Sequence, residues 1–175
     1  MFYPKTSYAK IAYDAILFYV STGQIKKTNE DKISADLRLK VACVVSILDA
    51  SDNLLQCCGN IDSKKGMLYD EIIENAISAA SNKKNTIKNE QLSELKVYVD
   101  ILSSLHKVED INDIKPQKHG LYVKAKSGKS GFVMPNKKGL NTFDKQLDAI
   151  KKDTGIKEKE ISNLELWYFK STRYD

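Results

Sequence analysis

Residues 39–59 carry the sequence LKVACVVSILDASDNLLQCCG, in which two apolar runs flank a polar turn. Every second residue from Leu39 to Ile47 is apolar, and the run is rich in β-branched side chains. We therefore expect a strand that is buried on at least one face. Residues 49–53 are typical turn formers, and Leu54–Cys58 would be the returning strand. The stretch therefore predicts a β-hairpin.

Three other segments have the apolar spacing of helices. The first covers residues 8–21, with Ser7 as its cap and Gly23 just past its end. The second covers residues 69–80 and has the most regular apolar stripe in the chain. The third starts after Thr142, carries Phe143, Leu147 and Ile150 on one face, and is expected to end at Gly155.

Further strands are predicted between and after these helices. They cover residues 97–101, 121–126, 132–135 and 164–170, with a tight turn at 127–131 that makes a second hairpin. The last strand is apolar on both sides, so we expect it to be central, and residues 26–36 are read as a loop. Helices and hairpins do not alternate regularly, which predicts an α+β fold with a mainly antiparallel sheet and packed helices. One domain over residues 1–175 is the simplest organisation.

Composition limits the classes of function. The net charge is +5, but 26 of the 28 basic residues are lysine and only Arg38 and Arg173 are arginine. Because arginine is preferred for bidentate phosphate and base recognition, we expect this charge to serve solubility more than phosphate binding. No stretch approaches the 18 or so apolar residues of a membrane span, so no membrane association is expected.

The three cysteines, Cys43, Cys57 and Cys58, do not form a disulfide framework and indicate a reducing, cytoplasmic setting. Cys57 is the candidate nucleophile, but a reactive thiol needs a base or a cationic setting. The two histidines, His106 and His119, are distant from it in the sequence. The alternative is that Cys57 and Cys58 are small buried apolar residues, as Cys43 is expected to be. No zinc spacing is present, and we predict no metal and no cofactor.

Seven lysines and no acid lie between Asp113 and Asp144. Tyr122, Lys124 and Lys126 would share one strand face, and Lys129 lies in the following turn. Such a face would suit a single-stranded nucleic acid, with the ring stacking on a base. The alternative is a solvated lysine face that prevents edge pairing.

Taken in order, these segments resemble the AMMECR domain family from about Tyr8 to Tyr174. The family hallmark Leu-Arg-Gly-Cys-Ile-Gly is matched by Leu54–Gly59, in which Leu55 and Gln56 replace the arginine and the first glycine. Other matches are residues 74–80, 99–103, 119–121, 131–135 and 146–147. Lys84 stands in a segment that replaces the family's Asp-Pro-Arg-Phe. The motif residues that the resemblance implies as binding residues are Leu54, Gly59, Asn60, Lys84, His119 and Gly120, with Cys57 as the catalytic candidate.

The resemblance implies a larger and a smaller lobe with a cleft near the cysteine motif. It also implies partners, namely a Memo-type protein of dioxygenase-like fold and a radical S-adenosylmethionine protein, and a suggested role in nucleic-acid or base modification. Two functions remain open. We expect an accessory or binding component of a larger enzyme system, and the alternative is an enzyme that uses Cys57 as nucleophile or redox centre, in nucleic-acid or base modification.

Overall fold

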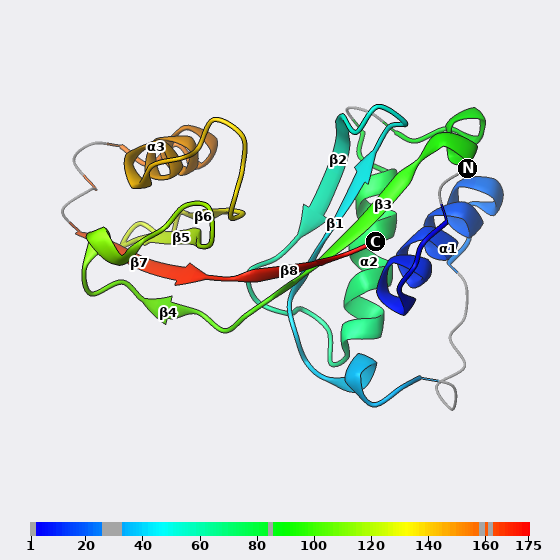
Figure 1. Cartoon of the computed structure of the whole chain (residues 1–175), viewed down its shortest axis with the longest axis horizontal. Helices are drawn as coiled ribbons and strands as arrows, with labels where there is room; N and C mark the ends of the chain where they lie inside the picture. The colour runs from blue at the N-terminus through cyan, green and yellow to red at the C-terminus, as the bar shows by residue number, and fades with distance from the viewer. Residues whose placement is uncertain (1–2, 26–32, 84–85, 158–159, 161–162) are drawn as a thin grey trace. The chain divides into compact units, whose positions relative to one another are not determined.

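A computed structural model describes residues 3–25, 33–83, 86–157, 160 and 163–175 (Figure 1). The chain divides into a larger unit, residues 1–102 with 172–175, and a smaller unit, residues 103–171. The described residues form two four-stranded sheets and three main helices, and every strand pair whose register is resolved is antiparallel. The predicted α+β class is confirmed.

The larger unit is built on the predicted hairpin. Its strands are β1 (Cys43–Leu48), β2 (Leu54–Gly59), β3 (Lys96–Leu102) and β8 (Ser171–Tyr174), in the order β2-β1-β3-β8. Helices α1 (Ser7–Thr22) and α2 (Leu68–Ala80) share one core with alternate residues of β1 and β3. Because side chains alternate along a strand, both helices cover the same face of the sheet. Two 3₁₀ turns, η2 (Asp36–Arg38) and η3 (Asn89–Glu94), complete the unit.

Two boundaries in this unit differ from the sequence prediction. The cap of α1 is Thr6, not Ser7, because Thr6 has extended backbone and its hydroxyl accepts the Ala9 N–H at 3.3 Å. The first strand begins at Cys43 and not at Leu39. Leu39 follows η2, is 58% exposed, and its carbonyl accepts the Leu68 N–H at the start of α2. Of the predicted loop 26–36, residues 26–32 lie outside the described residues.

The smaller unit contains the second predicted hairpin. Its strands are β4 (His106–Lys107), β7 (Leu164–Phe169), β5 (Gly120–Ala125) and β6 (Ser130–Val133), in the order β4-β7-β5-β6. A 3₁₀ turn, η4 (Ile111–Asp113), precedes β5. Helix α3 (Phe143–Thr154) packs on β5 and β6, with Thr142 and Gly155 at its ends as predicted.

The central position of residues 164–170 is confirmed, because β7 lies between β4 and β5. It is not the last strand, however, since β8 follows it and joins the other sheet at β3. Strands β4 and β8 were not predicted because they are short and polar, and their pairing partners lie about 60 or more residues away in the chain. Among the described residues no helix has the length and apolar character needed to cross a membrane.

Candidate functional site

The cysteine motif occupies β2, an edge strand of the larger unit's sheet. Leu54 is 54% exposed, and Cys57 is exposed opposite Ser46 of β1. Gly59 pairs with Val44, and a Cβ atom on Gly59 would lie 2.5 Å from the Cys43 carbonyl oxygen and 2.7 Å from the Val44 Cα. Only glycine fits there, so Gly59 serves close strand packing. Asn60 follows the strand and is half-buried, whereas Lys84 lies outside the described residues.

The three thiols are free and have different surroundings. Cys43 is buried, as predicted, and burial raises the pKa of its thiol to about 12. Cys58 packs against the core of the larger unit, and burial raises the pKa of its thiol, against a smaller opposing effect of a hydrogen bond with Ser78. The interpretation of Cys57 as a buried residue is wrong, since its side chain is exposed. Cys57 is therefore the accessible thiol of the motif.

A buried carboxylate holds the segment that follows the motif. Glu71 is 1% exposed, and its Oε2 accepts the backbone N–H groups of Lys64 at 2.8 Å and Lys65 at 2.9 Å. The Ser63 hydroxyl donates to the same oxygen at 3.2 Å. The sequence did not single out Glu71 among the acids, although it lies beside Ile72 on the apolar stripe of α2. A carboxylate next to such a stripe is the signal that would have found it.

A second buried carboxylate pairs with one of the two arginines. Asp100 is 3% exposed, and the Arg173 guanidinium donates to it through Nε at 3.1 Å and Nη2 at 2.8 Å. The hydrogen bond to Asp100 raises the pKa of Arg173. The guanidinium also lies over the Tyr98 ring, 5.3 Å from its centroid. Arg173 thus connects β8 to β3 within the larger unit.

The sheet brings several of these groups onto one face. Cys57 and Tyr98 are the two cross-strand neighbours of Ser46, and Asp100 is the neighbour of Val44. Val45 and Ile47 face the helices. Because side chains alternate along a strand, Cys57, Tyr98 and Asp100 project from the opposite, helix-free face of the sheet. Both histidines of the chain belong to residues 103–171, so the unit that carries Cys57 has no imidazole to act as its base.

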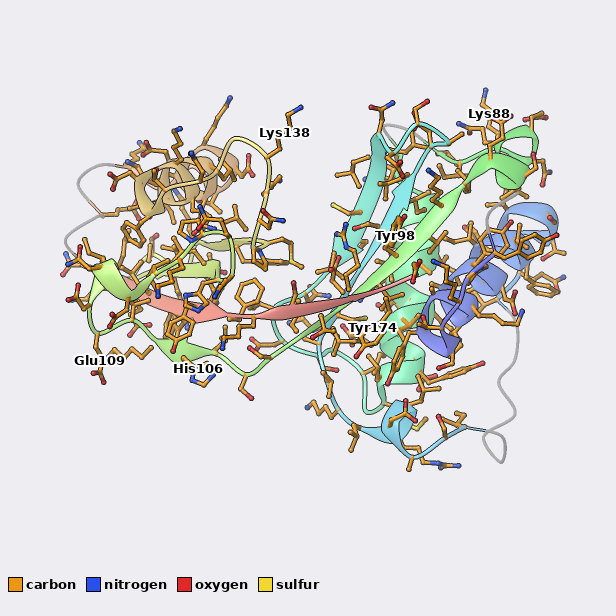
Figure 2. All side chains as sticks on the ribbon, viewed as in Figure 1. Lys88, Tyr98, His106, Glu109, Lys138 and Tyr174 are labelled. Carbon is orange, nitrogen blue, oxygen red and sulfur yellow. The ribbon has the colours of Figure 1, made fainter. Side chains whose placement is uncertain are left out.

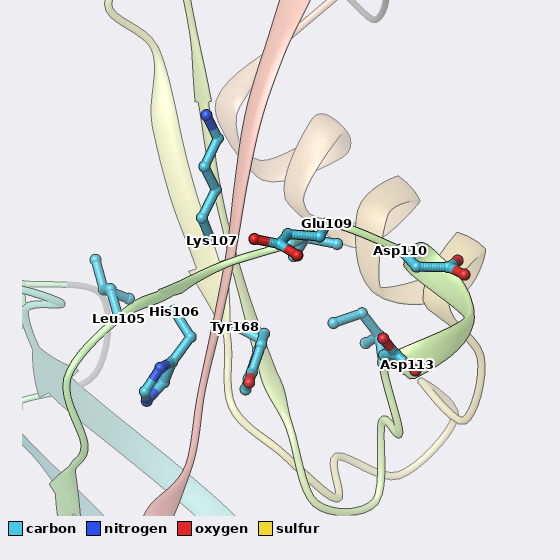
Figure 3. A pocket seen from close by; sticks show the side chains of 9 residues that line it. Leu105, His106, Lys107, Glu109, Asp110, Asp113 and Tyr168 are labelled. Atoms are coloured by element: carbon cyan, nitrogen blue, oxygen red, sulfur yellow. The ribbon is translucent and has the colours of Figure 1, made fainter.

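The two histidines both pack against Tyr168 in the smaller unit. The Tyr168 ring lies between His106, at 5.1 Å, and His119, at 4.7 Å between ring centroids. His106 and Tyr168 line a pocket of about 460 Å³ beside β4. Figure 3 shows these two side chains extending in the same direction from neighbouring strands, while Lys107 points the other way. His106 and Glu109 are also labelled in the full view of the side chains (Figure 2).

Two of the expected binding residues, His119 and Gly120, make packing and hydrogen-bond contacts within the smaller unit. The Lys115 N–H donates to His119 Nδ1 at 3.2 Å, and the buried Gln146 side chain donates to the His119 carbonyl at 3.1 Å. A Cβ atom at Gly120 would overlap the Phe169 ring, so glycine is required there. Burial lowers the pKa of His119, and the charges of Lys170, Lys115 and Lys118 lower it further.

The lowered pKa of His119 predicts that stability depends on pH. Because the folded-state pKa lies below the ordinary value of 6.5, the unfolded chain binds the proton more readily. This contribution to stability is complete above about pH 6.5 and is lost as the pH falls toward the folded-state pKa. In urea unfolding between pH 5 and 8, we expect His119→Gln to reduce the loss of stability below pH 6.5.

His106→Gln is the matched control, because it leaves His119 and its lysine neighbours in place. A His119 titration midpoint above 6.5, measured by NMR on the folded chain, would contradict the prediction.

The structure separates the residues of the predicted basic hairpin. Tyr122 and Lys124 project from β5 on the face away from α3, and Lys126 is exposed in the turn. Lys129 instead reaches the end of α3, where its ammonium donates to the Gly155 carbonyl at 2.5 Å. The predicted shared face thus holds Tyr122 and Lys124. Within the described ranges, no three histidine, cysteine or acidic side chains are grouped so that they could hold a metal ion.

Comparison with known proteins agrees with this fold. The AMMECR1 family model matches residues 9–174, and the chain belongs to the AMMECR1 family. A Thermotoga maritima protein is 30% identical over 169 residues, which cover 95% of this chain and 96% of that protein. The crystal structure of the uncharacterised protein PH0010 from Pyrococcus horikoshii has the same fold, with a TM-score of 0.76 at 19% identity. That match covers 95% of this chain and 88% of the other.

A second relative is much longer. Protein CA_C1420 of Clostridium acetobutylicum is 28% identical over 164 residues, which cover 92% of this chain but only 34% of that protein. The chain thus spans about a third of this relative.

Proposed function

We propose that the chain is an accessory or binding component of a larger enzyme system. The observation that carries this proposal is the Clostridium relative, in which the matching region makes up 34% of one polypeptide. A domain that forms about a third of a longer polypeptide in one organism is a natural candidate to bind a separate partner in another. The partners we propose are those implied by the family, a Memo-type protein and a radical S-adenosylmethionine protein, in the cytoplasm.

The edge strand β2 supports this proposal. Its six residues, Leu54–Gly59, contain no charge and no proline, which are the devices that commonly block edge pairing. Leu54 and Cys57 are exposed along it. An uncharged edge of this length suits the addition of an extended strand from a partner protein, in which backbone hydrogen bonds supply affinity and side-chain pockets supply specificity.

The test is complex formation between purified proteins. The chain is mixed with the Memo-type protein and with the radical S-adenosylmethionine protein of the same genome, and binding is measured by titration calorimetry. We expect a complex with one of them, weakened at least tenfold by Leu54→Glu. Leu39→Glu is the matched control, because Leu39 is equally exposed in the same unit but lies outside β2. The proposal is refuted if the chain binds neither protein, or if the two variants weaken binding equally.

The exposed Cys57 thiol supports a second candidate function, an enzyme that uses Cys57 as nucleophile or redox centre. We expect one thiol of the native chain to react rapidly with a disulfide reagent, and Cys57→Ser to remove this phase, because Cys43 is buried and Cys58 half-buried. Cys58→Ser is the control and should retain it. Alkylation of Cys57 at the rate of a free cysteine peptide favours the binding role, and a rate at least a hundredfold higher at neutral pH favours the enzyme.

A further inference from the structure

One row of side chains crosses all four strands of the smaller unit's sheet. The strand registers pair Lys107 with Trp167, Trp167 with Tyr122, and Tyr122 with Phe132. We call the aromatic members of this row, Trp167, Tyr122 and Phe132, the aromatic row. All three residues are half-buried, so each keeps part of its surface accessible.

The aromatic row lies on the face of the sheet away from α3. The intervening residues Leu121, Val123 and Leu166 belong to the core that α3 covers. Since side chains alternate along a strand, Tyr122 and Trp167 must project from the opposite face. Their ring centroids are 5.3 Å apart. The Phe132 ring lies 6.0 Å from the Phe169 ring between centroids, at an interplanar angle of 71°, and the Phe169 ring occupies the space above Gly120. The Tyr122 and Trp167 rings therefore lie together on this face, and Phe132 is the cross-strand neighbour of Tyr122.

The net positive charge of the chain lies in this unit. Residues 103–171 contain 14 lysines against nine acids, whereas the larger unit has 14 basic and 14 acidic residues. The smaller unit therefore carries the entire net charge of +5. On the helix-free face, Lys107 ends the aromatic row and Lys124 lies in the neighbouring row, with Glu165 opposite Lys124. Lys126 is exposed in the adjoining turn.

We propose that this face binds single-stranded nucleic acid, with bases stacked on the aromatic row and phosphates near Lys107, Lys124 and Lys126. Aromatic side chains on a four-stranded antiparallel sheet stack unpaired bases in this way, and nearby positive charge follows the backbone. Lysines act as point charges and not as bidentate forks, so binding should depend little on base sequence. A duplex should bind weakly, because its bases are stacked on each other. This inference is independent of the proposed function and of its partners.

The only tryptophan of the chain, Trp167, gives a direct readout. We expect a 12-nucleotide oligo-dT and an oligo-U of equal length to quench its fluorescence, and a 12-base-pair duplex to bind at least tenfold more weakly. Three phosphate contacts at a slope of about −0.7 each predict a roughly 20-fold loss of affinity between 50 and 200 mM salt. Inorganic polyphosphate, which has no bases, should not quench Trp167.

Four variants assign the binding to this face. Tyr122→Leu should weaken oligonucleotide binding about tenfold through loss of stacking. Lys124→Ala should weaken it several-fold, while Glu165→Gln, which removes the acid opposite Lys124, should strengthen it several-fold. Lys152→Ala is the matched control, because it removes the same charge from an exposed position on α3 and should change affinity less than twofold.

Circular dichroism checks that each variant is folded, and the gain expected for Glu165→Gln cannot arise from unfolding. The proposal is overturned if Trp167 fluorescence does not respond to either oligonucleotide, if the duplex binds as tightly, or if Lys152→Ala and Lys124→Ala weaken binding equally.

Discussion

Replacing Gly59 by alanine is expected to lower the free energy of unfolding by about 2–3 kcal/mol, as overpacking in a tight core does. The added Cβ would lie 2.5 Å from the Cys43 carbonyl oxygen and 2.7 Å from the Val44 Cα. Both are backbone atoms of the paired strand β1, so neither can move without distorting the ladder. Urea unfolding monitored by circular dichroism measures the change.

Gly66→Ala is the matched control in the same unit. Among the described residues, no atom beyond the two chain neighbours of Gly66 lies within 4 Å of a Cβ placed there, and its backbone does not require glycine. We expect this variant to change stability by less than about 1 kcal/mol, with a small gain from the reduced entropy of the unfolded chain. If the two variants lose similar stability, close packing at Gly59 is not the cause.

Arg173→Ala should destabilise the chain by about 2–3 kcal/mol, somewhat less than the usual cost of breaking a fully buried ion pair. The variant leaves the carboxylate of Asp100, which is 3% exposed, without its guanidinium partner. We expect a smaller loss of stability than for a fully buried ion pair because the Arg173 side chain is 54% exposed. Arg173→Lys should recover only part of the loss, since an ammonium cannot form the same two-pronged contact.

The exposed pair between Lys96 and Asp52 is the control for this ion pair. Its nitrogen–oxygen distance is also 2.8 Å, but the Asp52 side chain is 64% exposed. Lys96→Ala should therefore cost no more than about 1 kcal/mol. Chemical denaturation of the three variants in one buffer gives the comparison, and an equal cost for Lys96→Ala and Arg173→Ala would show that the burial of Asp100 is unimportant.

These contacts refine the interpretation of the scarce arginines. Arg173 is bound to Asp100 and Tyr98, and Arg38 donates from Nε to the Ile33 carbonyl at 3.2 Å. Both arginines therefore serve contacts within the larger unit. Any electrostatic binding of a phosphate backbone by the smaller unit must come from lysines, which agrees with weak, salt-sensitive and sequence-tolerant binding.

The motif on β2 also divides into separate roles. Gly59 is explained by its approach to β1, whereas Leu54 and Cys57 are exposed on the edge strand. A motif match by itself does not distinguish a packing residue from a contact residue. In this chain the distinction depends on which atoms surround each position, and it leaves Leu54 and Cys57 as the residues available to a partner or substrate.

Local patterns were sufficient for most of the fold. The apolar stripe of α2, the cap residues of α3, and the two hairpins were all predicted from spacing and turn residues close in the chain. These features depend on interactions within a few residues, which is why a single sequence reveals them. The central position of β7 followed in the same way from an apolar run on both faces.

The sequence by itself determined the α+β class, the hairpins, the helices and the exclusion of a disulfide framework. Only the tertiary structure decided which distant residues meet. It paired Asp100 with Arg173, placed Tyr168 between the two histidines, and aligned Trp167 with Tyr122 and Phe132. The physical reason is that strand register and burial depend on partners many residues away, and these fix which side chains share a face. Composition gave the net charge of +5, but only the division into units showed that this charge belongs to the smaller unit, which also carries the aromatic row.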